Sequence, residues 1–282
     1  MKTIRGTTPA ARGTGEPAFG AMNSPLLPLP QELDRITGLG FDFFELAMDA
    51  PMADHATVRS HAGRIREGLD GAGMGLVCHL PTFVYTADPC EAIRHTSLEE
   101  MRHSLETAAD LGARKAVIHP SPFSGLGRAM METTLARCRE NLDTICRRAA
   151  VLGIVLCLEN MFPRYHTGYR PAEFEGLLED HPDLMLTLDV GHANLGDKAC
   201  GAAAFIDRFP SRIGHLHFSD NSGTRDDHLP VGRGTIAFDD IVERLVHTGY
   251  GGTLTLEIFS GVASDLAESR QRVLDLWRAV SP

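Results

Sequence analysis

Short apolar runs that end in or next to a polar residue recur along the chain. Each run is short enough for a single strand, and several are apolar at almost every position, which is typical of parallel strands buried on both faces. The runs that we expect to form strands are Ala18–Asn23, Phe41–Leu46, Gly75–Leu80, Lys115–His119, Gly153–Glu159, Leu184–Asp189, Arg212–Phe218 and Gly252–Ile258.

Segments in which apolar residues recur at helical spacing lie between these runs. We expect helices over Gln31–Leu39, His55–Ala72, Glu91–Leu111, Met131–Leu152, Ala172–Glu179, Ala199–Phe209, Phe238–Thr248 and Asp265–Val280. Several of these segments are followed by a glycine just before the next strand, for example Gly73, Gly112 and Gly153. A glycine at this place is the expected C-terminal cap of a helix.

The alternation of strands and helices predicts an α/β protein built as a single (β/α)8 TIM barrel, with its active site at the C-terminal ends of the strands. A doubly wound open sheet is the alternative, but it would need a glycine-rich phosphate loop after an early strand, and none is present. Residues 1–17 lack periodicity and are rich in Gly, Thr, Arg and Ala. We therefore expect a flexible N-terminal tail over residues 1–17, followed by the barrel over residues 18–282.

Charge, cysteine content and the lack of long apolar segments bear on which partners the protein binds and where in the cell it lies. The 282 residues carry a formal net charge of -10, and no run of Lys or Arg could follow a nucleic-acid backbone. This disfavours nucleic acid as a partner, although arginines gathered in active-site loops would not show in the total. The cysteines form no C-x-x-C pair, and neither a membrane span nor a secretory signal is recognisable. We expect a cytoplasmic protein, and the sequence leaves open whether it forms a homo-oligomer.

The polar residues that close the apolar runs are candidate metal ligands, because barrel closure would point them into one mouth. Those at or next to the ends of the third to eighth strands are His79, His119, Glu159, Asp189, His217 and Glu257, and those just beyond the strands are His192, Asp226 and His228. Nitrogen and carboxylate ligands without thiolate suit Zn²⁺, Mn²⁺, Fe²⁺ or Co²⁺, and carboxylates alone could hold Mg²⁺. Because the set exceeds what one ion needs, we expect a divalent-metal cofactor of one to three ions.

Some residues near the strand ends fit other roles. A single His or Glu at a strand end is more often structural than a ligand, so the metal prediction depends on the convergence of six strand ends. His215 shares a strand face with His217, and we expect it in a second layer of the barrel. The candidate substrate contacts are Glu45, His192, Arg164 and Arg233, and for Arg164 a solvated loop is an equal alternative.

Several segments of the chain together resemble a known family. They are GFDFFEL at 40–46, LEN at 158–160, LDVGH at 188–192, HLHFSDN at 215–221, DDHLPVGRG at 226–234 and LEI at 256–258. In their order and spacing they are similar to the xylose isomerase-like barrels, which include sugar isomerases and epimerases and also endonuclease IV. The resemblance extends over essentially the whole chain after the tail.

The resemblance implies ligand roles. In the ketose epimerases of this family a Glu, an Asp, a His and a second Glu hold one divalent metal and the glutamates also handle protons, and the matching residues here are Glu159, Asp189, His217 and Glu257. Endonuclease IV holds three zinc ions with additional ligands, and the matching residues here are His79, His119, His192, Asp226 and His228. Both sets are present, so the ligands by themselves do not choose the reaction.

The leading interpretation is a metal-dependent isomerase or epimerase of a sugar, sugar phosphate or related hydroxy-carbonyl compound. The ion would stabilise an enediolate while one glutamate, Glu159 or Glu257, removes the proton beside the carbonyl and the other returns it. The alternative is an endonuclease IV-like multi-zinc phosphodiesterase that acts on abasic DNA or another phosphoester, although no basic or aromatic loop for opening a duplex is evident. A barrel that only binds a ligand is a third interpretation.

Overall fold

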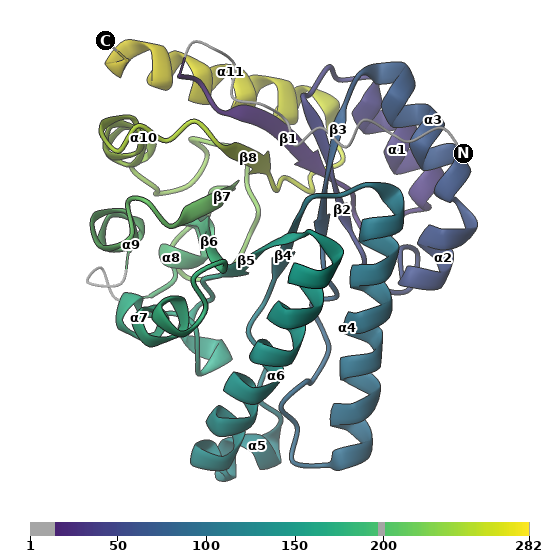
Figure 1. The fold of residues 1–282 in the computed structure, drawn as a ribbon. Coiled ribbons are helices and arrows are strands. Elements are labelled where there is room, and N and C mark those ends of the chain that lie inside the picture. The colour runs from purple at the N-terminus through teal and green to yellow at the C-terminus, as the bar shows by residue number, and fades with distance from the viewer. Residues whose placement is uncertain (1–14, 197–200, 282) are drawn as a thin grey trace.

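A closed barrel of parallel strands forms the centre of the molecule, as Figure 1 shows. The structure is a computed structural model that describes residues 15–196 and 201–281. The strands are β1 (Ala18–Met22), β2 (Phe43–Ala47), β3 (Gly75–His79), β4 (Lys115–Ile118), β5 (Val155–Glu159), β6 (Met185–Asp189), β7 (Ile213–Phe218) and β8 (Thr253–Leu256). Each strand pairs with its neighbours in sequence, and β8 pairs with β1 to close the ring. The predicted (β/α)8 barrel is therefore confirmed.

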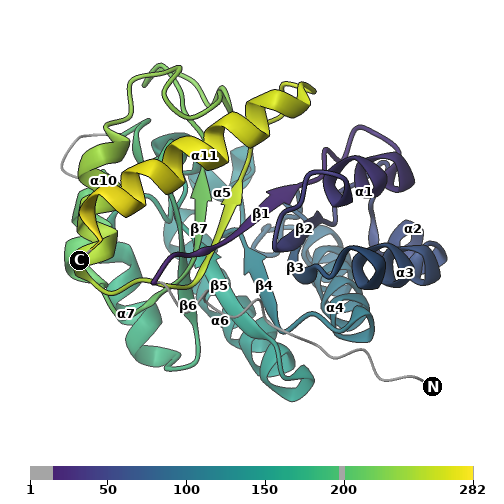
Figure 2. The ribbon, with the colours of Figure 1, turned by 90° about the horizontal axis from the view of Figure 1, so that it is seen from above.

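Helices surround the strands on the outside, which is clear in the view from above (Figure 2). They are α1 (Leu29–Thr37), α2 (His55–Ser60), α3 (Ala62–Ala72), α4 (Glu91–Leu111), α5 (Gly125–Ala129), α6 (Met131–Leu152), α7 (Pro171–Asp180), α8 (Val190–Ala193), α9 (Ala202–Arg208), α10 (Phe238–His247) and α11 (Ala263–Val280), with a 3₁₀ turn at Pro163–Tyr165. The single helix expected over 55–72 is divided at His61, whose φ of -102° interrupts it. The short helices α5 and α8 were not predicted, and the first two residues of the helix expected from Ala199 lie outside the described residues.

Glycine ends three of the long helices as the sequence predicts. Gly73, Gly112 and Gly153 follow α3, α4 and α6 with φ values of +66°, +90° and +68°. This left-handed conformation favours glycine, and it lets the backbone N–H groups of the cap satisfy carbonyls of the last helical turn. In each case a single glycine marks where the helix ends and the chain turns toward the next strand.

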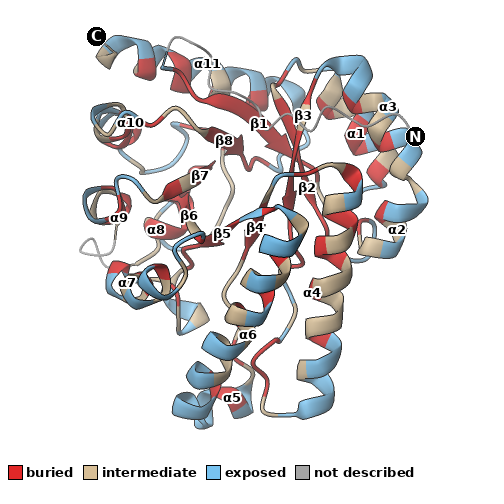
Figure 3. Cartoon of the chain, viewed as in Figure 1, coloured by how far each residue is buried: buried red, intermediate tan, exposed pale blue. Residues whose placement is uncertain are grey.

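Alternation along the strands divides the core into two regions. Residues of one parity, such as Phe44 and Leu188, pack outward against the helices in one large apolar cluster. Residues of the other parity face the barrel interior, where Ala18, Phe43 and Val77 with Val117 form a small apolar layer. Figure 3 shows the result, with the strands buried over most of their length and the helices buried mainly on their inner faces. Polar side chains of the inward parity occupy the rest of the interior.

The chain segment before β1 packs against the last helix. The indole Nε1 of Trp277 donates to the Gly15 carbonyl at 3.1 Å, and the Arg278 guanidinium pairs with Glu16 at 2.7 Å. Gly15 and Glu16, expected within the flexible tail, are thus in contact with α11, and residues 1–14 lie outside the described residues. Among the described helices, none combines the length and the hydropathy needed to cross a membrane.

Candidate metal centre and active site

The C-terminal ends of six strands deliver polar side chains to one end of the barrel interior. Glu159 and Asp189 are the last residues of β5 and β6, and His79 is the last residue of β3. His119 and Glu257 follow β4 and β8 directly, whereas His217 lies inside β7. Side chains two residues apart on a strand point to the same face. The six residues follow this spacing from the inward-facing positions of their strands, so their side chains also face the barrel interior.

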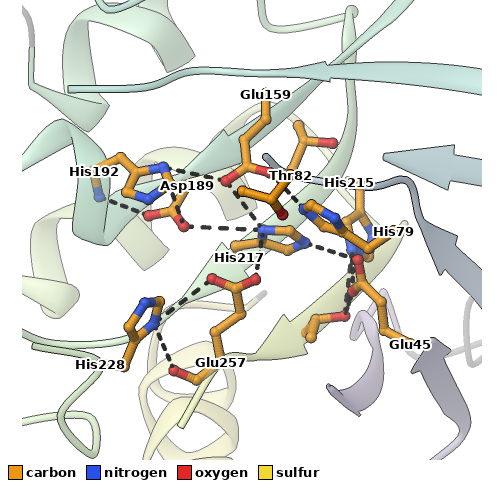
Figure 4. Close-up of polar contacts among 12 residues, drawn as sticks. Glu45, His79, Thr82, Glu159, Asp189, His192, His215, His217, His228 and Glu257 are labelled. Carbon is orange, nitrogen blue, oxygen red and sulfur yellow. Dashed lines mark hydrogen bonds and ion pairs between the residues drawn. The ribbon is translucent and has the colours of Figure 1, made fainter. Parts of the chain in front are cut away.

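His217 lies at the centre of three carboxylates (Figure 4). Its Nδ1 atom is 3.4 Å from Glu159 Oε1, 3.2 Å from Glu257 Oε1 and 3.9 Å from Asp189 Oδ2. All four side chains are almost completely buried. The four residues that the family resemblance assigns to one divalent ion therefore meet around a single ring nitrogen.

Two more histidines contact the other oxygen of Glu159. His79 Nε2 and His119 Nε2 lie 3.3 Å and 3.1 Å from Glu159 Oε2. Their rings meet edge to face with centroids 4.8 Å apart. Glu159 consequently joins the His217 group to a second group formed by strands β3 and β4.

The segment that follows β7 closes a third group. Asp226 Oδ2 lies 3.4 Å from His192 Nε2 and 3.2 Å from His228 Nε2. His192 in turn contacts Glu159 Oε1 through Nδ1 at 3.2 Å, and His228 Nδ1 contacts the Glu257 carbonyl at 3.1 Å. The structure thus brings all nine candidate metal ligands of the sequence into one continuous cluster.

Opposite pKa shifts separate the two glutamates. Burial opposes ionisation of Glu159, but the rings of His119 and His217 outweigh it and hold the pKa of this carboxyl well below its ordinary value. Burial raises the pKa of Glu257 to about 7, against the lowering influence of His217. The centre therefore holds one carboxylate that stays ionised and one that takes up a proton near neutral pH.

His217 and His192 are held in a charged state by these acids when no ion is bound, whereas burial outweighs the contact of His119 with Glu159 and lowers the pKa of His119. Burial by itself would lower the pKa of His217 and of His192, but the surrounding carboxylates, led by Glu257 for His217 and Asp189 for His192, raise both well above the ordinary value. His215 differs, because burial outweighs its contact with Glu45 and lowers its pKa to about 4.

The donor set fits a divalent cation. Glu159 Oε1, His217 Nδ1 and Asp226 Oδ1 are buried and make no hydrogen bond within the described chain, and the first two meet only charged groups of the cluster at 3.2 Å or more. Ligand atoms of His79, His119 and Glu159 lie within 4.8 Å of one another, as do those of Glu159, Asp189 and His192. Imidazole and carboxylate groups without thiolate are the ligands of Zn²⁺, Mn²⁺, Co²⁺ and Fe²⁺.

The expected substrate contacts occupy different places. His192 lines the cluster, but Glu45 is buried on the far side of His217 and accepts a hydrogen bond from its Nε2 at 3.1 Å. Arg164 is exposed in the 3₁₀ turn, and Arg233 pairs with Asp265 at 2.9 Å. The position of Glu45 favours a supporting role over the substrate contact expected from the sequence.

Asn160 is a supporting residue that sequence reasoning missed. Its side chain donates to the Asp189 carbonyl at 2.9 Å and accepts from the Asp189 N–H at 2.8 Å. Its carbonyl lies 3.0 Å from His192 Nδ1, which leaves Nε2 of that ring directed at Asp226. The only signal in the sequence is its position directly after Glu159, in the segment LEN.

Comparison with known proteins identifies a family with this fold and relatives with a named reaction. The family described as "Xylose isomerase-like TIM barrel" matches residues 33–279. The uncharacterized protein MJ1311 of Methanocaldococcus jannaschii is 29% identical over 250 residues, which cover 85% of this chain and 83% of that protein. The L-ribulose-5-phosphate 3-epimerase UlaE of Shigella flexneri is 25% identical over 253 residues, or 86% of each chain.

Solved structures with the same fold include sugar epimerases. A D-tagatose 3-epimerase-like protein superposes with a TM-score of 0.82 at 26% identity, covering 93% of this chain and 98% of its own. The D-psicose 3-epimerase of Clostridium cellulolyticum H10, solved with D-tagatose, has a TM-score of 0.76 and covers 94% of this chain and 100% of its own. At 18% identity that second likeness concerns the fold alone.

Proposed function

Because the chain belongs to the xylose isomerase-like TIM barrel family, we propose that it is a divalent-metal-dependent epimerase or isomerase of a sugar or sugar-like hydroxy-carbonyl compound. One observation carries the proposal: the carboxylates of Glu159, Asp189 and Glu257 surround His217 Nδ1 in a buried cluster. The L-ribulose-5-phosphate 3-epimerase and the D-tagatose 3-epimerase-like protein among the relatives support the choice of reaction.

Glu159, Asp189, His217 and Glu257 would hold the ion, and the neighbouring histidines offer ligands for others. A bound divalent ion would polarise the substrate carbonyl and the adjacent hydroxyl, which stabilises negative charge next to the reacting carbon. The oligomeric state and a cytoplasmic location remain expectations from the sequence.

The two glutamates would move the proton. They approach His217 from different sides, with Glu159 on β5 and Glu257 after β8 (Figure 4). Epimerisation needs a base that removes the proton beside the carbonyl and an acid that returns one to the other face. One of Glu159 and Glu257 would act as the base and the other as the acid; their pKa values in the metal-free centre do not assign the two roles, because binding of the ion displaces protons from its ligands. His192 would orient a substrate hydroxyl.

Solvent-proton exchange tests this proposal. Metal-loaded protein is incubated in D₂O with D-tagatose, D-psicose and D-fructose in parallel, and the sugars are analysed by NMR and mass spectrometry. We expect deuterium at the carbon beside the carbonyl, together with the epimer, for at least one ketose. Failure of every ketose to exchange, in protein that demonstrably holds metal, contradicts the proposal.

The full ligand set favours one second candidate, an endonuclease IV-like multi-zinc phosphodiesterase. His79, His119, His192, Asp226 and His228 lie where further ions could bind beside the first. Cleavage of an abasic-site duplex by wild-type protein, lost in His79→Ala, would favour this candidate. Elemental analysis separates the two as well, since three ions per chain favour the phosphodiesterase and one favours the epimerase.

A further inference from the structure

Glu45 on β2 is a buried carboxylate to which the proposed reaction gives no task. It has no exposed surface, and both of its oxygens accept hydrogen bonds from side chains. Oε1 accepts from His217 Nε2 at 3.1 Å, whereas Oε2 accepts from His215 Nε2 at 2.9 Å and from the Thr255 hydroxyl. A carboxylate is costly to bury unless its charge and lone pairs are matched, so these contacts fix its position.

These hydrogen bonds cross the barrel interior. β1 and β8 separate β2 from β7 in the ring, so Glu45 and His217 come from walls that are not adjacent. The imidazole of His217 lies between Glu45 and the acidic cluster, with Nε2 facing Glu45 and Nδ1 facing Glu159 and Glu257 (Figure 4). Glu45 therefore touches the centre only through the His217 ring.

The acceptor character of Glu45 fixes which nitrogen of His217 carries a proton. A carboxylate that is ionised can only accept, so Nε2 of His217 must donate to it. A neutral ring then has its lone pair on Nδ1, the atom that faces the three acidic ligands. Metal-binding histidines characteristically donate their other ring N–H to a carboxylate or a carbonyl, which sets the tautomer and the ring orientation.

A chain of hydrogen bonds that ends at Oε2 of Glu45 also holds the carboxylate. His215 donates through Nε2 to Glu45 and accepts through Nδ1 from the Thr253 hydroxyl at 2.6 Å. That hydroxyl accepts from Lys115 Nζ at 2.7 Å, and Lys115 also donates to the Gly214 carbonyl at 2.6 Å. Lys115, the Thr253 hydroxyl and His215 thus form a chain of hydrogen bonds whose last acceptor is the Glu45 carboxylate.

We propose that Glu45 is a positioning residue for the metal centre, which accepts the Nε2 proton of His217 and so presents Nδ1 of that ring to a divalent ion. The inference rests on the proposed metal-dependent function and gives Glu45 no contact with the substrate. Glu45, His215 and His217 lie close enough together to hold an ion themselves. Their direct hydrogen bonds, however, already occupy the facing nitrogen and oxygen atoms.

Metal affinity tests the proposal, with Glu45→Gln as the variant and Glu32→Gln as its matched control. Glu32 is another buried carboxylate, on α1. It pairs with Arg35 at 2.7 Å and makes no hydrogen bond or ion pair with the described residues of the metal centre. Zn²⁺ affinity is measured by competition with a chromophoric chelator, and the Co²⁺-loaded proteins are compared by visible absorption. We expect Glu45→Gln to weaken Zn²⁺ binding about 10- to 100-fold and to change the Co²⁺ spectrum, and Glu32→Gln to do neither.

The outcomes separate this inference from the proposed function. Wild-type Zn²⁺ affinity and Co²⁺ spectrum in Glu45→Gln would overturn the role of Glu45, even if the wild-type chain binds metal and exchanges substrate protons. A wild-type chain that binds no divalent ion overturns both.

NMR of the wild-type protein keeps the inference testable if Glu45→Gln does not fold. The Nε2 proton of His217 should be hydrogen-bonded and protected from solvent exchange in the Zn²⁺-loaded chain. A rapidly exchanging or absent Nε2 proton on His217 would overturn the role of Glu45.

Discussion

Glu159 is the residue through which the groups of the candidate centre are joined. Its two oxygens contact His79, His119, His192 and His217, and it stays ionised although it is buried. We expect Glu159→Gln to lower kcat/KM for the best ketose by at least about 100-fold, because it removes both a ligand charge and a candidate acid or base. Steady-state kinetics together with metal content per chain checks this prediction.

The matched control for that substitution is Glu67→Gln, on the exposed face of α3. It removes one negative charge from the same molecule without touching the centre, so we expect unchanged kinetics. Equal loss of activity in both variants would mean that net charge, and not the contacts of Glu159, decides the effect.

The proton on Glu257 should make the number of protons released on metal binding depend on pH. The pKa of about 7 means that this carboxyl carries a proton below neutral pH in the metal-free chain and must lose it to bind a cation. We expect calorimetric titration with Mn²⁺, repeated in buffers of different ionisation enthalpy, to show more protons released at about pH 6 than at about pH 8. Equal proton release at the two pH values would contradict the assignment of Glu257 as a ligand.

At the scale of elements, the segment between β7 and α10 depends on one buried acid. The carboxylate of Asp220 accepts from the backbone N–H groups of Gly232 and Gly234 at 2.9 Å and 2.8 Å, and from those of Asn221 and Ile236. A Cβ at Gly234 would lie 2.3 Å from the Asn221 carbonyl oxygen, so the backbone packs closely around this acid. This arrangement positions the part of the segment that carries Asp226 and His228.

We therefore expect Asp220→Asn to destabilise the protein by about 1 to 3 kcal/mol, because an amide replaces an acceptor oxygen with a donor that faces N–H groups. Urea denaturation in the presence of a chelator measures the effect without a contribution from metal. Asp227→Asn is the control in the same segment, since this carboxylate pairs with the exposed Arg225 and should change stability far less than Asp220→Asn.

The strands and most helix ends could be predicted because their signals are local. An apolar run bounded by a polar residue, or a glycine after a helix, depends only on neighbours in sequence, and the strand ends then place their side chains in one mouth. The break at His61 was missed because helical spacing continues on both sides of it. The pairing of Glu45 with His215 and His217 could not be predicted, because it depends on which walls of the barrel face each other.

At the scale of the whole molecule, the closed barrel concentrates like and unlike charges in one buried volume. His79 and His228 each have a pKa raised to about 9, because contacts with Glu159 and with Asp226 outweigh burial, which would lower it. Divalent ions compete with these protons for the same nitrogen and oxygen atoms. Global stability should therefore respond differently to pH with and without metal.

The sign of that response follows from the direction of the histidine shifts. A histidine whose pKa rises from about 6.5 in the unfolded chain to about 9 in the folded chain binds more protons when folded, so its stabilisation is complete below about pH 6.5 and is lost as the pH rises through 9. We expect the Tm of the chelator-treated protein to fall between pH 6.5 and 9, and the Tm of protein with excess Mn²⁺ to fall less or to rise, because deprotonated ligands bind the ion more tightly. Differential scanning calorimetry across this range checks both curves, and parallel curves would show that protons and metal do not share the cluster.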